Sequence, residues 1–441
     1  MFRWFERSTR LGLKEKMEKS ETVQSVIGLG YVGLPLAVEF AKAGLETIGI
    51  DIDQTKVAKV NAGESYIGDV AEEELREVVS SGKLRATTDF SILQEIDTIN
   101  IAVPTPLRKT KDPDISYIVA ALKEIKKYIH KGQLIILEST TYPGTTEEVM
   151  MPILEESGLK VGSDFYLAFS PERVDPGNEK YTTKNIPKVV GGVTPACTEL
   201  AAALYTAAGM NPVPVNSSRV AETVKLLENT FRSVNIGLVN EIALMCNRMG
   251  INVWEVIDAA ATKPFGFMPF YPGPGLGGHC IPIDPFYLSW KAKQSGFDAR
   301  FIELAGMING DMPAQVVVRV AEALNNKKKC MNGSRILIMG ISYKSDIDDT
   351  RESPAFDIIR LLLKRGSDVC WYDPFVEDID IEGEAVEKFE YNAEELKSID
   401  CAIIVTGHSN VDYNPLVNNC DLIFDSRNVL KELENENIVR L

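Results

Sequence analysis

Histidine, paired cysteine and basic residues are all scarce in this sequence. Only three histidines occur among 441 residues, and the seven cysteines are scattered without a CxxC pair or the cysteine–histidine spacing of a metal site. These features argue against a histidine metal centre and against a disulfide scaffold. We therefore expect a cytoplasmic protein with reduced thiols and no bound metal.

The charge balance is acidic. Lys and Arg number 47 against 63 Asp and Glu, a formal net charge of −16. A chain without a basic excess is not expected to bind nucleic acid, although a local group of donors can still bind one phosphate-bearing ligand. No apolar run is long enough to span a bilayer, and the first residues lack the apolar stretch of a signal peptide. We expect neither nucleic acid nor membrane as a partner.

The length of the chain predicts more than one hydrophobic core. A short charged extension occupies residues 1–21, and short apolar runs then alternate with helical segments over 22–216. Helices dominate 217–326, and strand–helix alternation resumes over 327–441. Such alternation is typical of doubly wound sheets. The predicted fold class is α/β, with two Rossmann-like doubly wound parallel-sheet domains joined by a central helical domain.

Particular segments carry this prediction. Strands are expected at 98–103, 134–137, 165–169, 188–190, 335–339 and 368–372, and helices at 219–249 and 355–365. The long helix at 219–249 has apolar residues at helical spacing on both sides. It is either an element of a dimer interface or a helix buried within its own domain.

A glycine-rich turn near the N-terminus predicts a dinucleotide site. Gly28, Gly30 and Gly33 follow an expected strand and open a helix, with Tyr31 and Val32 inside the turn. The glycines permit a tight turn, a close approach of backbone to pyrophosphate and close packing of helix on sheet. Asp51 ends the next strand, where its carboxylate can accept both ribose hydroxyls and would repel a 2′-phosphate. NAD is therefore favoured over NADP, and the alternative is a tight turn in an unrelated α/β fold.

The segment from Gly273 to Asp284 reads Gly-Pro-Gly-Leu-Gly-Gly-His-Cys-Ile-Pro-Ile-Asp. Glycines here serve either positive φ or a ligand that lies against bare backbone. A thiol on such a loop, Cys280, is better placed to attack a ligand than to pack in a core. The alternative is a buried free cysteine beside a flexible turn.

Together these motifs resemble the UDP-glucose/UDP-N-acetylhexosamine 6-dehydrogenase family, over roughly residues 22 to 430. Further matching segments are Val103-Pro-Thr-Pro106, Glu138-Ser-Thr-Thr141, Ser170-Pro-Glu172, Ala221-Glu-Thr-Val-Lys225 with Asn229, and Tyr343-Lys344 with Asp349-Thr-Arg-Glu-Ser353. Within the family, Ser170–Asn178 and Tyr271–Gly275 are most similar to UDP-N-acetylglucosamine 6-dehydrogenases.

The resemblance implies an NAD-dependent four-electron oxidation of the C6 hydroxyl of a UDP-sugar, for surface polysaccharide precursor synthesis. Two hydrides leave the sugar in turn, and an aldehyde lies between the two steps. Cys280 would capture that aldehyde as a thiohemiacetal, which is oxidised to a thioester and then hydrolysed. A homodimer or higher homo-oligomer is the expected assembly.

The resemblance also implies roles for particular residues. The catalytic group comprises Cys280, Lys225, Asn229, Asp284, Glu172 and Thr140, with Glu172 as the candidate base for hydrolysis. Lys225 and Asn229 are four residues apart, hence on one helix face. The expected cofactor contacts are Gly28, Gly30, Tyr31, Val32, Gly33, Asp51, Thr105, Thr140 and Arg351. The expected substrate contacts are Glu172, Arg173, Lys225, Asn229, Tyr271, Gly275, Gly277 and Lys344.

One departure bears on the substrate. Glucose-using relatives tend to place a second glutamate where this chain has Pro176. UDP-N-acetylglucosamine is therefore the first expectation, with UDP-N-acetylmannosamine or UDP-glucose as alternatives. Two other functions stay open: a two-electron hydroxyacid or 6-phosphogluconate-type dehydrogenase, and a non-catalytic sensor of NAD and nucleotide sugar. His279, beside the thiol, is expected to tune or pack the cysteine.

Overall fold

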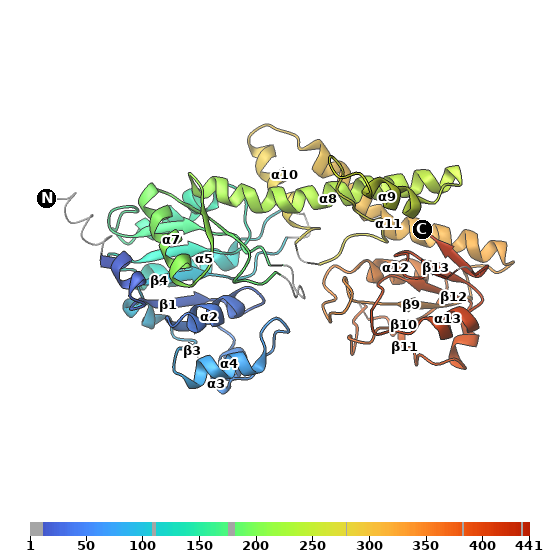
Figure 1. Cartoon of the computed structure of the whole chain (residues 1–441), viewed down its shortest axis with the longest axis horizontal. Helices are drawn as coiled ribbons and strands as arrows, with labels where there is room; N and C mark the ends of the chain where they lie inside the picture. The colour runs from blue at the N-terminus through green and yellow to red at the C-terminus, as the bar shows by residue number, and fades with distance from the viewer. Residues whose placement is uncertain (1–11, 108–111, 175–180, 279, 382, 434) are drawn as a thin grey trace. The chain divides into compact units, whose positions relative to one another are not determined.

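The computed structural model describes residues 12–107, 112–174, 181–278, 280–381, 383–433 and 435–441. The chain divides into two compact units. Unit 1 comprises Met1–Glu228 and Trp290–Ser295, and unit 2 comprises Asn229–Ser289 and Gly296–Leu441. Figure 1 shows a sheet with flanking helices in each unit. His279 and Pro176 lie outside the described residues.

Unit 1 contains an eight-stranded sheet in the order β3-β2-β1-β4-β5-β6-β7-β8. The strands are β1 (Val23–Ile27), β2 (Glu46–Ile50), β3 (Leu84–Thr87), β4 (Thr98–Ile101), β5 (Leu134–Leu137), β6 (Tyr166–Phe169), β7 (Lys188–Gly192) and β8 (Pro212–Pro214). Strands β1 to β6 are parallel, which is the doubly wound arrangement predicted from the alternating pattern.

Strand β7 departs from the expected parallel extension, because it pairs with β6 in the antiparallel direction. A parallel neighbour requires a crossover, normally a helix, that returns the chain to the starting edge. The described part of the connection, 170–174 and 181–187, contains no helix. The chain therefore turns back at the edge where β6 ends, and β7 begins there with Lys188.

Helices cover both faces of this sheet. One core joins Ile136 of β5 to α2, α4 and α7, and the other joins Ile135 of the same strand to α5 and α6. Adjacent strand residues enter opposite cores because successive side chains alternate across a strand. The helices are α2 (Gly33–Lys42), α3 (Gln54–Ala62), α4 (Glu72–Ser80), η1 (Phe90–Glu95), α5 (Ser116–Tyr128), η2 (Thr146–Met150), α6 (Met151–Glu155) and α7 (Pro195–Ala207).

Unit 2 repeats the same topology in a six-stranded sheet, ordered β11-β10-β9-β12-β13-β14, with all pairings parallel. The strands are β9 (Arg335–Met339), β10 (Asp368–Tyr372), β11 (Glu387–Lys388), β12 (Cys401–Ile404), β13 (Ile423–Asp425) and β14 (Ile438–Arg440). Its helices include α12 (Pro354–Lys364), η3 (Glu395–Ser398) and α13 (Asn414–Asn419). The predicted second α/β sheet is confirmed.

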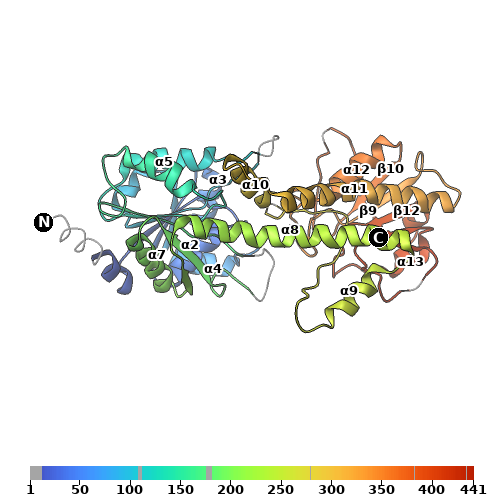
Figure 2. The same ribbon diagram turned by 90° about the horizontal axis from the view of Figure 1, so that it is seen from above.

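The described residues of the central helical segment, 217–278 and 280–326, include the helices α8 (Ser218–Met249), α9 (Val253–Ala261), α10 (Asp284–Gln294) and α11 (Arg300–Asn326). Figure 2 shows α8 as one continuous helix, as the apolar spacing at 219–249 predicts. Among the described residues, no helix combines the length and the apolar character needed to cross a bilayer.

Candidate active site

The glycine turn of unit 1 has the geometry of a nucleotide cradle. Gly28 has φ +91°, and a Cβ there would lie 2.6 Å from the carbonyl oxygen of Ala102. A Cβ at Gly33 would lie 1.8 Å from the carbonyl oxygen of Gly28, so the start of α2 can approach the turn only without a side chain. A Cβ at Gly30 would meet nothing within 4 Å. The first and third glycines serve packing, and the second leaves room for a ligand.

Asp51 holds this turn together. Its Oδ2 accepts the amide of Leu29 at 2.8 Å and its Oδ1 accepts the amide of Asp53 at 3.0 Å. A carboxylate oxygen has two lone pairs, so each can still accept a ribose hydroxyl. Val32 opens α2 without a side-chain cap, and helix N-terminal amides attract phosphate. The residues present fit a bound NAD.

The other expected cofactor residues of unit 1 follow parallel strands at the same edge. Thr105 follows β4 and is buried, and Thr140 follows β5 and is half-buried. Tyr31 is 47% exposed beside the glycines. Ligands of doubly wound sheets bind at the carboxyl ends of the strands. Thr105 and Thr140 therefore lie at the same edge of the sheet as the glycine turn.

The candidate base Glu172 belongs to a buried cluster of charges at this edge. Its Oε1 accepts the amides of Arg173 and Val174 at 2.7 and 2.9 Å, and its Oε2 accepts Lys188 Nζ at 3.0 Å. The same ammonium donates to Oε2 of Glu138 at 2.8 Å. The Lys188 side chain is 4% exposed, that of Glu138 is wholly buried and that of Glu172 is 13% exposed. One cation thus joins two carboxylates.

Glu138 is held from its other side as well. Its Oε1 accepts Asn100 Nδ2 at 2.9 Å and also the hydroxyl of Tyr205. Burial raises the pKa of Glu138, against the opposing charge of Lys188. Burial would also raise the pKa of Glu172, but Lys188 and the two backbone amides outweigh it and lower that pKa below its usual value. The structure therefore favours Glu172 as a carboxylate.

Arg173, an expected substrate contact, is engaged within unit 1. Its guanidinium donates to both carboxylate oxygens of Glu228 on α8, at 2.5 and 3.2 Å, and to the carbonyl of Pro187 at 2.7 Å. Lys225, one turn earlier on α8, is 8% exposed. Within the described residues of unit 1, the side-chain ammonium of Lys225 has no hydrogen-bond or ion-pair partner. Such a state is unusual for a buried ammonium.

In unit 2, the exposed thiol residue Cys280 begins a turn that leads into α10. Its carbonyl accepts the amides of Ile283 and Asp284 at 3.1 and 2.8 Å. Asp284 is the first residue of α10 and is 2% exposed. Asn229 of α8 donates from Nδ2 to Asp284 Oδ2 at 2.6 Å. Three predicted catalytic residues, Cys280, Asp284 and Asn229, therefore come together within this unit.

For the glycines before Cys280, the sequence left open positive φ or contact with a ligand, and the structure shows positive φ at Gly278 together with close packing at Gly277 and Gly278. A Cβ at Gly277 would lie 2.5 Å from Cβ of Tyr343, and one at Gly278 would lie 2.7 Å from the ring of the same tyrosine. Gly278 also has φ +81° and donates its amide to the carbonyl of Arg351 at 2.9 Å. These two glycines make room for Tyr343 after β9.

The remaining expected substrate residues, Tyr271, Gly275 and Lys344, also belong to unit 2. Tyr271 is 46% exposed, stacks on Trp254 with a centroid distance of 6.1 Å and donates its hydroxyl to Asp258 at 2.8 Å. Gly275 has φ +141°. Lys344 follows β9 at the carboxyl edge of the second sheet. Arg351, an expected cofactor contact, pairs with Asp349 at 2.6 Å and has a 43% exposed side chain.

Unit 2 contains a second copy of the Asp51 turn. Gly340 donates its amide to Tyr372 at 2.8 Å, and Ile341 donates to Oδ2 of Asp373 at 2.7 Å. The equivalent bonds in unit 1 join Gly28 to Ile50 and Leu29 to Asp51, both at 2.8 Å. In unit 2, however, His408 Nε2 lies 3.1 Å from the acid. The Asp373 carboxylate is therefore paired with a histidine of the same unit, unlike Asp51 in its described surroundings.

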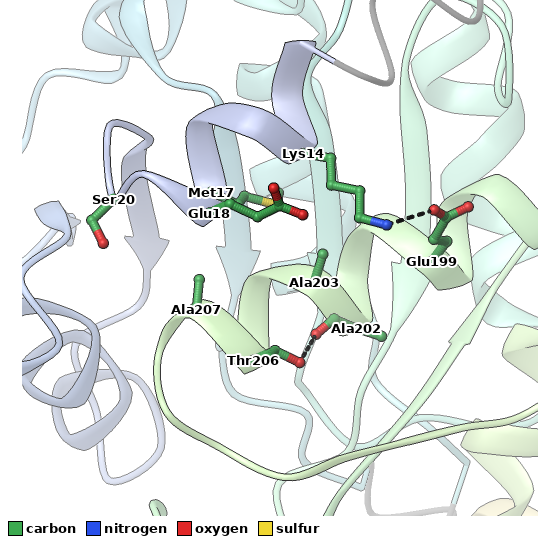
Figure 3. A pocket seen from close by; sticks show the side chains of 9 residues that line it. All are labelled: Lys14, Met17, Glu18, Ser20, Glu199, Ala202, Ala203, Thr206 and Ala207. Carbon is green, nitrogen blue, oxygen red and sulfur yellow. Dashed lines mark hydrogen bonds and ion pairs between the residues drawn. The ribbon is translucent and has the colours of Figure 1, made fainter.

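Residues 12–18 are helical, and Leu13 and Met17 in this segment enter a core of unit 1. Between this segment and α7 lies a hollow of about 460 Å³, where Lys14 Nζ donates to Glu199 at 3.0 Å (Figure 3). The alanines of α7 form much of its floor. Residues 12–18 thus cover α7, a contact that the sequence did not indicate.

Sequence reasoning missed Lys188, Glu138, Tyr205 and the Asp373–His408 pair as site residues. Glu138 did belong to a recognised segment, but nothing in the sequence signalled its partner fifty residues away. Asp373 carried a usable signal, because it ends the second strand of a strand–helix repeat, as Asp51 does. No group of three or more His, Cys, Asp or Glu side chains in the described ranges could hold a metal ion.

All three domains of the UDP-glucose/GDP-mannose dehydrogenase family match the sequence. The NAD binding domain matches residues 23–208, the central domain 219–311 and the UDP binding domain 337–432. Fold, nucleotide cradle and domain matches together define an NAD-dependent UDP-sugar dehydrogenase. The chain belongs to the UDP-glucose/GDP-mannose dehydrogenase family.

Individual relatives agree with this assignment. A UDP-N-acetyl-D-glucosamine 6-dehydrogenase of Pseudomonas aeruginosa is 40% identical over 356 residues, covering 80% of this chain and 82% of the relative. A UDP-N-acetyl-D-mannosamine dehydrogenase of Pyrococcus horikoshii is 36% identical over 414 residues, covering 92% and 96%. A solved structure of the UDP-D-ManNAc dehydrogenase from that organism has a TM-score of 0.87 at 34% identity, covering 95% of this chain and 98% of that one.

Proposed function

We propose that the protein oxidises the C6 hydroxyl of a UDP-N-acetylhexosamine to a carboxylate, with UDP-N-acetylglucosamine as the preferred sugar. The names of the relatives support an acetamido sugar. UDP-N-acetylmannosamine is the second candidate, because the mannosamine relative covers 92% of this chain and the matching solved structure has a TM-score of 0.87. The two sugars differ at one stereocentre.

The observation that carries the proposed chemistry is the turn at Cys280, with Asp284 and Asn229 hydrogen-bonded beside it at 2.6 Å. NAD, when bound, supplies the hydride acceptor for each of the two oxidations. Cys280 Sγ forms a bond to C6 at the aldehyde stage, which keeps the reactive carbonyl from solvent and prepares a thioester. Lys225 and Asn229 stabilise the oxyanion on C6, and Asp284 orients Asn229.

Hydrolysis then releases the product. Glu172 accepts a proton from the attacking water, and Thr140 helps to orient that water. The water oxygen bonds to C6, the C6–S bond breaks and Cys280 leaves as a thiolate.

We further propose a homodimer or higher homo-oligomer. Helix α8 leaves Phe231, Leu238 and Met245 about half exposed, at 47%, 53% and 47%. Apolar side chains gathered on one helix are typical of a surface covered by a partner. Light scattering of the purified protein tests the assembly, and a monomer at micromolar concentration would contradict it.

The function is tested by counting NADH per sugar over a panel of UDP-sugars, with Cys280→Ser and a matched Cys330→Ser control. Cys330 is also an exposed cysteine of unit 2, and its Sγ donates to the local Asn332 carbonyl at 3.1 Å. The wild-type protein and Cys330→Ser should form two NADH per UDP-N-acetylhexosamine, and Cys280→Ser at most one. One NADH from the wild type would indicate a two-electron dehydrogenase, and binding without turnover would indicate a sensor.

A further inference from the structure

We propose that Lys188 is a positioning residue that fixes Glu172 and holds it as a carboxylate for thioester hydrolysis. The inference rests on the proposed function, in which Glu172 is the base. It adds a residue that neither the motifs nor the comparisons assign, and it gives a role to the antiparallel strand β7.

The direction of β7 brings Lys188 to the site. Phe169 of β6 pairs with Gly191 of β7 in the antiparallel register. Continuing that register by three residues sets Glu172 opposite Lys188, and the side chains indeed meet, with Nζ 3.0 Å from Oε2. A parallel β7 would carry its first residue to the far edge of the sheet. The antiparallel direction of β7 therefore places the Lys188 ammonium against the Glu172 carboxylate.

Lys188 is itself fixed in place by Glu138. The ammonium donates to Glu138 Oε2 at 2.8 Å, and Glu138 is held by Asn100 and by the Tyr205 hydroxyl. The Lys188 ammonium also lies 5.4 Å from the centre of the Tyr205 ring. A buried ion pair confers little net stability unless its groups are fully hydrogen-bonded, but it does impose one geometry. The cluster thus orients the lysine, and the lysine orients Glu172.

The charged and titratable groups in the surroundings of Glu172 come from four elements. Lys188 begins β7, Glu138 follows β5, the Tyr205 hydroxyl comes from α7, and Glu228 of α8 draws the Arg173 guanidinium to itself. Among the described residues of unit 1, Lys188 is the cation whose ammonium contacts the Glu172 carboxylate, at 3.0 Å. Glu172 accepts the backbone amides of Arg173 and Val174 as well as the Lys188 ammonium. These contacts leave 13% of the Glu172 side chain exposed, which is enough for one face of the carboxylate to meet water.

The consequence lies in the pH dependence of hydrolysis. Glu172 must be ionised to accept a proton from water, so the rate falls as the pH drops through its pKa. An opposite charge at this distance lowers a carboxyl pKa by roughly 1–3 units. Loss of Lys188 should raise that pKa, so that the acidic limb of the rate profile moves to higher pH by about the same amount.

The experiment compares Lys188→Met with Lys188→Arg and with a control, Lys160→Met. Lys160 forms an ion pair with Glu155 at 2.8 Å, and its side chain is 65% exposed. Like Lys188 it pairs with a glutamate, but unlike Lys188 it is not buried. The readout is the single-turnover rate of uronate formation from pH 4 to 9. We expect the acidic limb of Lys188→Met to move up by at least about one pH unit, and the limbs of Lys188→Arg and Lys160→Met to coincide with wild type.

A double-variant cycle with Glu172→Gln tests the route of the effect. If Lys188 acts through Glu172, adding Lys188→Met to Glu172→Gln causes no further loss of rate. A multiplicative loss would overturn the proposal, as would an unmoved acidic limb in Lys188→Met.

Lys188→Met leaves two buried carboxylates facing each other, so Lys188→Met with Glu138→Gln is prepared as a charge-balanced partner, with an upward shift that is smaller because the repulsion from Glu138 is absent. If neither variant retains the NAD affinity and the circular dichroism of wild type, the lysine is structural and the proposal is wrong. The proposed function fails separately: wild-type protein that forms no uronate from any UDP-sugar contradicts it, whatever the variants do.

Discussion

The side-chain amide of Asn229 lies 2.6 Å from Oδ2 of Asp284, and both groups are buried in unit 2. The bond joins α8 to the first residue of α10, directly after the turn that carries Cys280. It therefore connects a helix to the loop of the candidate nucleophile.

The first prediction concerns this bond. Asn229→Ala removes one donor from a buried carboxylate, which should lower the free energy of unfolding by about 1–3 kcal/mol and reduce turnover. Thermal melting without ligands and steady-state NADH formation measure the two effects. Asn235→Ala is the matched control, because Asn235 is a half-buried residue of the same helix whose side-chain amide donates to the nearby Phe231 carbonyl at 2.7 Å. Equal effects of the two substitutions would contradict the assignment.

The second prediction separates two glycines of the cradle. Gly30→Ala adds a Cβ with no protein atom within 4 Å, so the melting temperature should hold while the NAD Kd rises at least about tenfold. Gly33→Ala sets its Cβ against the Gly28 carbonyl and should destabilise unit 1 even without NAD. Calorimetric titration with NAD and thermal melting distinguish them. Gly68→Ala, equally open and in the same unit, is the control, and a Gly30→Ala protein with wild-type affinity would refute the cradle.

The third prediction concerns the pH dependence of unit 2. Burial would raise the pKa of Asp373, but bonds from His408 and from the amides of Ser342, Phe375 and Ile341 lower it to about 2. Because the unfolded carboxyl has a pKa of about 3.9, the stability from Asp373 is fully present above about pH 4 and is lost as the pH falls toward 2.

Asp373→Asn should therefore flatten the stability profile between about pH 4 and 2 and cost about 1–3 kcal/mol at neutral pH. Urea unfolding at several pH values, followed by the fluorescence of Trp371, measures both. Asp368→Asn, at a carboxylate that is 69% exposed, is the control. An unchanged slope in Asp373→Asn would show that the pair with His408 does not hold the acid.

Much of this architecture was predictable from local patterns. The strands at 335–339 and 368–372 match β9 and β10, because each is a short apolar run between polar turns. The helix predicted at 219–249 matches α8 within one residue, since no proline interrupts its spacing. The glycine fingerprint likewise predicted the cradle, because Gly28 and Gly33 are required by close backbone contacts and Gly30 leaves open space at the turn.

What the sequence could not predict depends on pairing across the fold. An apolar run such as 188–192 indicates a strand but not its direction, so Lys188 resembled any lysine at the start of a strand. Its contacts with Glu138 and Glu172 arise only once β7 is reversed beside β6. In the same way, the sequence offered positive φ or ligand contact as the reason for Gly277 and Gly278, but it gave no sign that Tyr343 packs against both.

The most direct test of the central claim is the mass of the Cys280 peptide during turnover. Glu172→Gln protein is mixed with UDP-N-acetylglucosamine or UDP-N-acetylmannosamine and excess NAD, quenched in acid within milliseconds to minutes and digested for peptide mass spectrometry. The account predicts a thioester adduct of the UDP-sugar on Cys280, absent from Cys330 and lost on treatment with hydroxylamine. An unmodified Cys280 at every time point, while the wild-type protein continues to form uronate, would contradict the account.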